Sequence, residues 1–364
     1  MIKKIVVVAG ARPNFIKVAQ LVRQLKRDKS FQCRLVHTGQ HYDFEMSEVF
    51  FHELDIPRPD VFLGVGSGSH AEQTAKIISA FEKVLLSDRP DLVIVAGDVN
   101  STLACSLTAA KLNIRVAHIE AGLRSFDRTM PEEINRIVTD TLSSIHFASE
   151  QSGLDNLRRE GVDMKNVHLV GNTMIDPLAA NLKTIDKAKS LKKLGVKPHG
   201  YAILTLHRPS NVDLAESLDS VFQILKSVTS MIPLVYPIHP RTRASMEAHG
   251  MFQRFSSLPG LLITEPLGYI DFIKLVKESR FALTDSGGIQ EETTWLRVPC
   301  LTMRDTTERP STTSIGTNKL VGTDAKEISR CVDQILKDKW KKGRVPKYWD
   351  GKTTERIVDI LRKI

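Results

Sequence analysis

Residues 92–124 read LVIVAGDVNSTLACSLTAAKLNIRVAHIEAGLR, and this stretch decides the fold. It holds two short apolar runs, 92–97 and 115–120, separated by a segment long enough for a helix. Neither run alternates strictly between polar and apolar residues, which is typical of strands buried on both faces of a parallel sheet. The stretch therefore predicts a β-α-β unit with two parallel strands.

The same alternation of short apolar runs with longer amphipathic segments continues in both directions. The other runs expected to form strands are 5–8, 34–38, 146–149, 167–171, 201–206, 234–238, 261–265, 281–284, 300–303 and 319–321. These runs fall into two sets, so the sequence predicts an α/β protein with two Rossmann-like, doubly wound parallel-sheet domains. We place the boundary after Gly171, ahead of a lysine-rich segment.

Length and composition narrow the class of protein further. The 364 residues suffice for two domains at about 150 residues each, and the 41% hydrophobic and 26% charged content is ordinary for a soluble enzyme. No run reaches the ~18 apolar residues that a membrane helix needs. The four cysteines lie far apart with no CxxC, which argues against a disulfide framework and fits a reducing cytoplasm.

The net charge of +9 raises the question of a nucleic-acid partner. Segments 183–197 and 325–364, however, together carry more net positive charge than the whole chain. No stripe of basic and aromatic residues and no nucleic-acid-binding motif is present. We therefore expect neither a nucleic-acid nor a membrane partner.

Three carboxylates follow strand ends or helix starts in the first half. Open α/β sheets bind ligands beyond the carboxyl ends of their strands. Asp98 and Glu120 end two apolar runs, and Glu132 follows Pro131 at an expected helix start. Each alone fits a turn or a helix-dipole role. Together at one sheet edge they could perform acid–base chemistry on opposite faces of one substrate.

Two cations and an amide also lie at this predicted edge. Arg12 and Lys17 are near the start of the helix expected after the first strand, where anions are favoured. Gln40 follows the second strand, which by itself is a weak signal because turns are polar. The chain has neither a GxGxxG fingerprint nor a P-loop, so nicotinamide and P-loop chemistry are poorly supported.

Basic turns and a glycine-rich turn follow strands of the second half. His207, Arg208 and His239 suit a diphosphate or a proton transfer. The glycines of Ser286-Gly287-Gly288 would let backbone N–H groups approach a phosphate. Glu292, one helical turn on, could accept both ribose hydroxyls.

Arg309 lies in another polar segment that follows a strand. No HExxH or GxSxG motif occurs, and the histidines lack metal-ligand spacing. The sequence therefore predicts no metal site.

Nine motifs, spread over nearly the whole chain, resemble the non-hydrolysing UDP-N-acetylglucosamine 2-epimerases and occur in that family's order. DSGGIQEE (285–292) with MRDTTERP (303–310) is the most specific combination. The others are GARPNFIK (10–17), TGQH (38–41), GDVNSTLA (97–104), HIEAGLRS (118–125), MPEEINR (130–136), VGNTMIDPL (170–178) and GTNKLVGTD (316–324).

The resemblance implies a glycosyltransferase-B-like fold with the active site in the interdomain cleft. The first domain would comprise 1–171 plus 349–364, because the final helix crosses back onto it, and 172–348 would bind UDP. The family interconverts UDP-GlcNAc and UDP-ManNAc without a cofactor. UDP leaves by anti elimination, giving 2-acetamidoglucal, and is then added back. A homodimer and a role in polysaccharide precursor synthesis are also implied.

The family's essential residues match Asp98, Glu120, Glu132 and His207, which are therefore the catalytic candidates. We expect Glu120 and Glu132 to serve the C2 proton, and Asp98 and His207 to assist the diphosphate leaving group. The contacts to nucleotide and diphosphate match Arg12, Lys17, Arg136, Ser286, Gly287, Gly288, Glu292 and Arg309. Gln40, Arg208 and His239 complete the predicted binding residues.

Alternatives follow from departures within these motifs. GARPNFIK and the segment 40–51 also resemble relatives that epimerise UDP-2,3-diacetamido-glucuronic acid, but those tend to depart at TTERP, which is intact here. Segments 40–48 and 64–73 differ from the members that UDP-GlcNAc activates allosterically, which argues against that regulation here. A glycosyltransferase of the same fold is the rival enzyme class. Three strand-end carboxylates favour proton transfer at C2 instead.

Overall fold

The structure is a computed structural model that describes residues 2–40 and 57–364, except the side chain of Arg12. Contacts divide the chain into two units, described separately below. Unit 1 comprises Met1–Ala180 and Lys347–Ile364, and unit 2 comprises Asn181–Pro346. Most of segment 40–51, which bears on allostery and substrate choice, lies outside the described residues.

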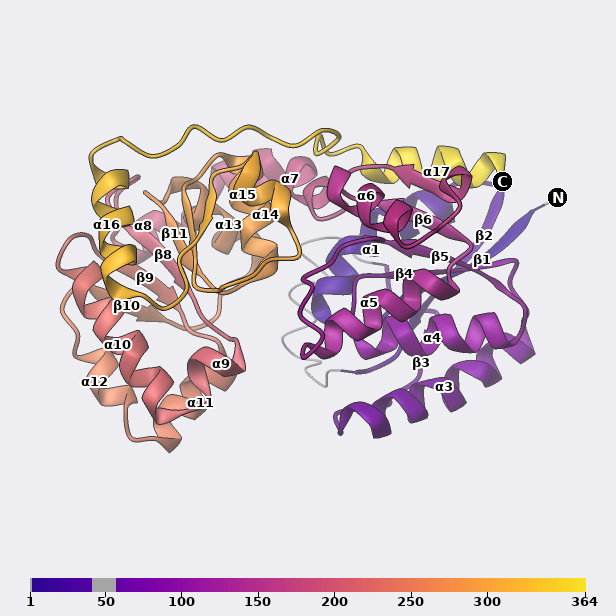
Figure 1. Cartoon of the computed structure of the whole chain (residues 1–364), viewed down its shortest axis with the longest axis horizontal. Coiled ribbons are helices and arrows are strands. Elements are labelled where there is room, and N and C mark those ends of the chain that lie inside the picture. Colours follow the sequence, from indigo (N-terminus) through magenta and orange to yellow (C-terminus); the bar gives the residue numbers. More distant parts are fainter. Residues whose placement is uncertain (1, 41–56) are drawn as a thin grey trace. The chain divides into compact units, whose positions relative to one another are not determined.

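Unit 1 is built on a seven-stranded parallel sheet with the order β3-β2-β1-β4-β5-β6-β7. Its strands are β1 (Lys3–Ala9), β2 (Phe31–His37), β3 (Val61–Phe62), β4 (Leu92–Ala96), β5 (Arg115–Ile119), β6 (Ile145–Ala148) and β7 (Val167–Leu169). Its helices are α1 (Arg12–Arg27), α3 (His70–Ser87), α4 (Asn100–Lys111), α5 (Pro131–Leu142), α6 (Gln151–Arg159), η1 (Met164–Asn166) and α17 (Thr353–Lys363). Helix α3 packs on α4 and α4 on α5, whereas α1 packs on α17 (Figure 1). Helix α7 (Ile175–Lys187) begins in unit 1 and ends in unit 2.

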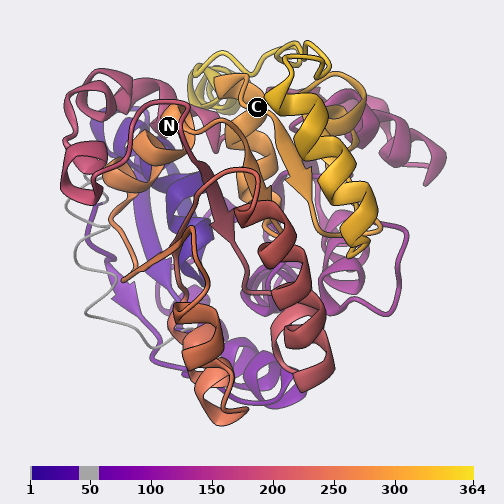
Figure 2. The ribbon, with the colours of Figure 1, turned by 90° about the vertical axis from the view of Figure 1, so that its left-hand side faces the viewer.

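Unit 2 is built on a six-stranded parallel sheet with the order β10-β9-β8-β11-β12-β13. Figure 2 shows the ribbon of this unit, coloured from red to yellow, from a second direction. Its strands are β8 (Ala202–Thr205), β9 (Leu234–Pro237), β10 (Leu261–Thr264), β11 (Ala282–Thr284), β12 (Cys300–Thr302) and β13 (Asn318–Leu320). Its helices are α8 (Ser190–Leu194), α9 (Pro209–Val212), α10 (Ala215–Thr229), α11 (Pro240–Ala248), α12 (Phe252–Ser256), α13 (Tyr269–Glu278), α14 (Gly287–Leu296), α15 (Pro310–Ser314) and α16 (Ala325–Leu336).

Two parallel α/β sheets confirm the predicted fold class, and each of the twelve apolar runs forms a strand. The sequence did not reveal β3, whose two residues pair only with Val36 and His37 of β2. An edge strand this short leaves no apolar run to recognise.

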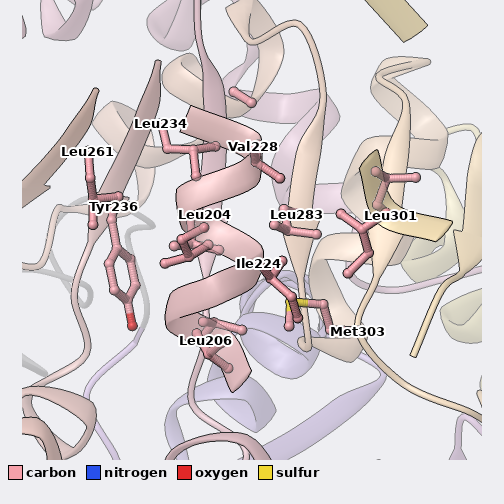
Figure 3. Close-up of a cluster of buried hydrophobic side chains, with 14 of the residues drawn as sticks. Leu204, Leu206, Ile224, Val228, Leu234, Tyr236, Leu261, Leu283, Leu301 and Met303 are labelled. Atoms are coloured by element: carbon pink, nitrogen blue, oxygen red, sulfur yellow. The ribbon is translucent and has the colours of Figure 1, made fainter. Parts of the chain in front are cut away.

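The strands of unit 2 are apolar throughout because both faces of the sheet are covered. Leu204 and Leu283 join one hydrophobic cluster with α10 (Figure 3). Their neighbours Ile203 and Ala282 belong to a second cluster, which includes residues of α13. Successive side chains of a strand point to opposite faces. Burial on both faces thus explains the missing alternation.

The last helix of the chain is anchored to unit 1 by buried polar contacts. Trp349 is 1% exposed and donates its indole N–H to the Ser149 carbonyl at 2.9 Å. The Asp176 carboxylate accepts from the backbone N–H groups of Thr353 and Thr354 at 3.1 and 2.6 Å. These are first-turn N–H groups of α17, which have no partner within the helix.

Of the described helices, none is long and apolar enough to cross a membrane.

Candidate active site

Three adjacent strands of unit 1, β1, β4 and β5, bring their carboxyl-end turns together. Lys17 of α1 reaches across to Glu120 after β5, with 2.7 Å between Nζ and Oε2. Gly97 after β4 makes room for it, because a Cβ there would lie 2.9 Å from the Lys17 Nζ atom. Both side chains of the pair are buried, at 7% and 3% exposure.

Glu120 combines backbone strain with an unused oxygen. Its φ is +72°, a conformation that costs a non-glycine residue about 1–3 kcal/mol and persists only where the surroundings enforce it. Its Oε1 atom is buried and accepts no hydrogen bond from the described residues. A buried carboxylate with one oxygen fixed by Lys17 and the other unused is suited to accept or deliver a proton.

A buried polar network pins the turns after β4 and β5. The imidazole of His118 lies 2.6 Å from the Asp140 carboxylate through Nδ1 and 2.8 Å from the Gly97 carbonyl through Nε2. The other Asp140 oxygen accepts from the Gly122 N–H at 3.0 Å and pairs with Arg124 at 2.7 Å. The network thus fixes residues on both sides of Glu120.

The same network makes Asp140 a source of stability that acid removes. Burial alone would raise the pKa of this carboxyl. The charges of His118 and Arg124 and the hydrogen bonds from His118 and Gly122 outweigh that effect and hold the pKa below 3.8. Since folding lowers this pKa, the contribution is complete above about 3.8 and is lost as the pH falls through the lowered value.

We therefore expect acid destabilisation to be shallower in Asp140→Asn than in wild type. The measurement is the free energy of unfolding in urea between pH 5 and pH 2. Asp333→Asn, which removes an exposed partner of Lys337, should keep the wild-type slope. An unchanged slope in Asp140→Asn would show that Asp140 does not supply this linkage.

Helix α5 supplies the second group of charges at this edge. Arg136 donates to the Asp98 carboxylate through Nε at 3.1 Å and through Nη2 at 2.5 Å. Its Nη1 donates at 2.7 Å to Glu133, which also accepts from the backbone N–H groups of Ser125 and Phe126 at 2.9 Å. The Glu133 carboxylate is therefore occupied by these hydrogen bonds, which fix the loop before α5.

Glu132, next to Glu133, is half-buried in the first turn of α5. No ion pair or hydrogen bond joins its side chain to the described residues. Of the two adjacent acids, Glu132 is thus the one available to a ligand.

Gln40 and Arg12 are the other two predicted binding residues of unit 1, and the structure describes the side chain of Gln40 only. Gln40 is 6% exposed, and its Oε1 atom accepts from the backbone N–H and the hydroxyl of Ser101 at 3.1 and 2.7 Å. It therefore ties the turn after β2 to α4. Arg12 is the first residue of α1, and its side chain lies outside the described part of the structure.

In unit 2, the end of β8 lies beside the end of β11. Asp285, after β11, is fully buried and bonded to His207 and Arg208, which follow β8. The imidazole ring of His239 lies 6.4 Å from that of His207, measured between centroids. His239 caps α11, because its Nδ1 accepts from the Arg241 N–H at 3.2 Å.

The N-terminus of α14 begins at Gly287, with Ser286 as its N-cap residue. The Arg309 guanidinium lies against Gly287, where a Cβ would be 2.7 Å from Nη1. Arg309 also pairs with Glu291 at 2.8 Å and with Glu308. Gly288 lies in the same first turn, and Glu292 is 5% exposed further along the helix.

These arrangements differ in the chemistry that they allow. Unit 1 presents carboxylates beside cations at one sheet edge, which suits proton transfer. Unit 2 presents a helix N-terminus beside an arginine, which suits a phosphate. Among the described residues, no group of three or more His, Cys, Asp or Glu side chains could hold a metal ion.

Asp140 and Asp285 were not among the residues predicted from the sequence. Asp285 directly follows an apolar run, so the rule applied to the other strand ends would have found it. Asp140 lies near the end of helix α5, and its role can be inferred only from its contacts in the structure. No pattern in the sequence predicts its pairing with His118.

The family model described as UDP-N-acetylglucosamine 2-epimerase matches residues 23–362. The enzyme of that name from Methanocaldococcus jannaschii is 42% identical over 367 residues, which cover 98% of each chain. The UDP-2,3-diacetamido-2,3-dideoxy-D-glucuronate 2-epimerase of Pseudomonas aeruginosa is 39% identical over 99% of this chain and 100% of its own.

Solved structures give the same result. The crystal structure of the M. jannaschii enzyme in complex with UDP-GlcNAc and UDP matches with a TM-score of 0.91, covering 99% of this chain and 100% of that chain. The Neisseria meningitidis enzyme bound to UDP-GlcNAc is 32% identical, with a TM-score of 0.90 and the same coverage. The galactosyltransferase WaaB, at 13% identity and a TM-score of 0.53, shares the fold alone.

Proposed function

The chain belongs to the UDP-N-acetylglucosamine 2-epimerase family, and from this premise we propose that it interconverts UDP-GlcNAc and UDP-ManNAc. It is a nucleotide-sugar 2-epimerase, an isomerase, with a glycosyltransferase-B-like fold. The observation that carries the substrate proposal is the full-length similarity to enzymes of this activity. The buried pair of Lys17 and Glu120 supports the proton chemistry.

The reaction proceeds by elimination and readdition of UDP. A base removes the proton at C2, the electron pair forms the C1=C2 bond of 2-acetamidoglucal, and the bond from C1 to the diphosphate oxygen breaks. Readdition of UDP with protonation on the other face of C2 gives the epimer. The C2 proton is weakly acidic, so the departure of UDP accompanies its removal.

Inversion at C2 needs proton transfer on both faces, and therefore more than one acid–base group. We assign this task to Glu120 and Glu132. The orientation of Glu120, with Oε2 on Lys17 and Oε1 unused, supports this role. So does the absence of a partner for Glu132 among the described residues.

The leaving diphosphate carries the charge that develops as the C1–O bond breaks. Asp98 and His207 assist its departure, and Lys17 and Arg136 contribute positive charge beside the carboxylates. Arg12 belongs with them by its place at the start of α1.

The nucleotide is held by residues of unit 2. The first turn of α14, from Ser286 to Gly288, offers backbone N–H groups to the diphosphate, with Arg309 alongside. Glu292 accepts the ribose hydroxyls. Gln40, Arg208 and His239 complete the site, and no metal or cofactor takes part.

We also propose a cellular compartment, an oligomeric state and a use for the product. All four cysteines are free thiols, which supports a reducing cytoplasm. A homodimer is expected from the family resemblance, and C2 dimers are the commonest assembly. The product feeds the synthesis of polysaccharide precursors.

A second substrate is favoured by one observation. The P. aeruginosa relative, whose name specifies UDP-2,3-diacetamido-2,3-dideoxy-D-glucuronate, is nearly as similar as the M. jannaschii enzyme. The two substrates differ at C3 and C6, whereas the bonds that change in the reaction are at C1 and C2.

The test is an NMR time course with each UDP-sugar supplied separately. We expect UDP-ManNAc to form from UDP-GlcNAc until the two reach equilibrium. If only the diacetamido-glucuronate is turned over, that sugar and not UDP-GlcNAc is the substrate. Release of free ManNAc would indicate a hydrolysing enzyme. No epimer from either sugar would contradict the proposed function.

A further inference from the structure

Asp285 lies where two parallel strands bring their ends together. Thr205 of β8 pairs with Thr284 of β11. The residues that follow, including His207, are therefore carried to the same place as Asp285. The carboxylate accepts from the His207 N–H at 3.1 Å, from the Arg208 N–H at 2.9 Å and from His207 Nδ1, which lies 2.9 Å from Oδ1.

The surroundings make Asp285 an acceptor only. Asn211 donates a further hydrogen bond at 3.0 Å to Oδ2. Burial by itself would raise the pKa of Asp285. The hydrogen bond and charge of His207, with the hydrogen bonds from Arg208 and Asn211, outweigh burial and hold the pKa below 3.8. Four donor groups thus converge on one buried, ionised carboxylate.

An ionised carboxylate at Nδ1 determines what His207 can offer to a ligand. Because the carboxylate has no proton to give, Nδ1 must carry the hydrogen of this bond. The imidazole is 47% exposed, although Asp285 is fully buried. Nε2 is therefore the nitrogen left for substrate, as an acceptor in the neutral ring and as a donor in the imidazolium.

Asp285 also fixes the turn that carries His207. Its own carbonyl accepts from Arg208 Nε at 3.2 Å, and its carboxylate accepts the N–H groups of two successive residues. The next residue, Ser286, is the N-cap of α14. One aspartate therefore ties the imidazole to the helix terminus that is suited to a diphosphate.

We propose that Asp285 is a positioning residue, which fixes the orientation and the Nδ1–H form of His207 so that Nε2 faces the diphosphate. This inference rests on the proposed function. When the C1–O bond breaks, its electron pair moves to the β-phosphate oxygen, and Nε2–H of the imidazolium donates a hydrogen bond to that oxygen. The bond is released again on readdition of UDP.

Asp285→Asn tests this role, because asparagine keeps the shape of the side chain. An amide has one oxygen to accept with, whereas several donors converge here, and it carries no negative charge to stabilise the imidazolium. We expect kcat to fall by about 10²-fold or more, with KM within about threefold. Asp333→Asn, at a position of α16 whose side chain is 47% exposed, should have wild-type kinetics.

A double variant separates positioning from a general structural effect. If Asp285 acts through His207, then His207→Gln/Asp285→Asn should have the same kcat as His207→Gln alone. If the fold-losses in kcat of the two single variants multiply in the double variant, the inference is overturned. So would wild-type kcat in Asp285→Asn.

Nitrogen-15 NMR of wild-type imidazoles gives a readout that needs neither activity nor the aspartate variant. His207→Gln identifies the His207 signals. We expect the neutral ring to carry its proton on Nδ1, and finding it on Nε2 overturns the inference. A wild-type protein that epimerises no UDP-sugar but shows Nδ1–H contradicts the proposed function and leaves the pair intact.

Discussion

Replacing Glu120 with glutamine should lower kcat for epimerisation by about 10²- to 10⁴-fold, the range that general acid–base groups contribute. Glutamine keeps the size of the side chain and can still accept a hydrogen bond from Lys17. It cannot take the C2 proton through the atom that corresponds to Oε1, which is buried and unused by the described residues. The loss should therefore appear in kcat, with a small change in KM.

The measurement is steady-state kinetics with UDP-GlcNAc, with UDP binding as a check on folding. Glu355→Gln, on the exposed face of α17, serves as the matched control and should retain wild-type activity. Near-wild-type kcat for Glu120→Gln would remove Glu120 from the proton chemistry.

Replacing Lys17 with methionine should lower the free energy of unfolding by about 3–5 kcal/mol, because it leaves the buried Glu120 carboxylate without its positively charged partner. The pair is almost fully buried, and the 2.7 Å contact joins α1 to the turn after β5. Glu120 in addition has a strained backbone that the surroundings must enforce. Methionine keeps most of the volume of the lysine stem, so lost packing should contribute little.

The double variant Lys17→Met/Glu120→Gln isolates the charge effect. With both partners neutral, the stranded charge is gone, and much of the lost stability should return. Urea unfolding of the four proteins gives the coupling. Additive losses, with no recovery in the double variant, would mean that the ion pair does not govern the stability of this edge.

The sequence predicted the sheets well because burial on both faces leaves a strong signal. Val93 and Ile94, for example, point to opposite faces of the sheet, yet both are fully buried. Strand-end reasoning also selected Asp98 and Glu120, since parallel strands carry their ends to one edge. The short edge strand β3 left no comparable signal.

Contacts between side chains could not be predicted in the same way. Glu132 and Glu133 are adjacent and chemically alike, and only the bonds to the Ser125–Phe126 loop show that Glu133 is occupied. The pairing of His118 with Asp140 depends on the packing of α5 against β5. A helix position 22 residues away along the chain gives no sign of this contact.

In the proposed reaction, different groups remove and return the proton on the two faces of C2. The most direct test is NMR of the wild-type reaction with UDP-GlcNAc in D₂O. Because the proton that leaves on one face is replaced from the other, every inversion should place deuterium at C2 of UDP-ManNAc. Formation of UDP-ManNAc with hydrogen retained at C2 would contradict the account.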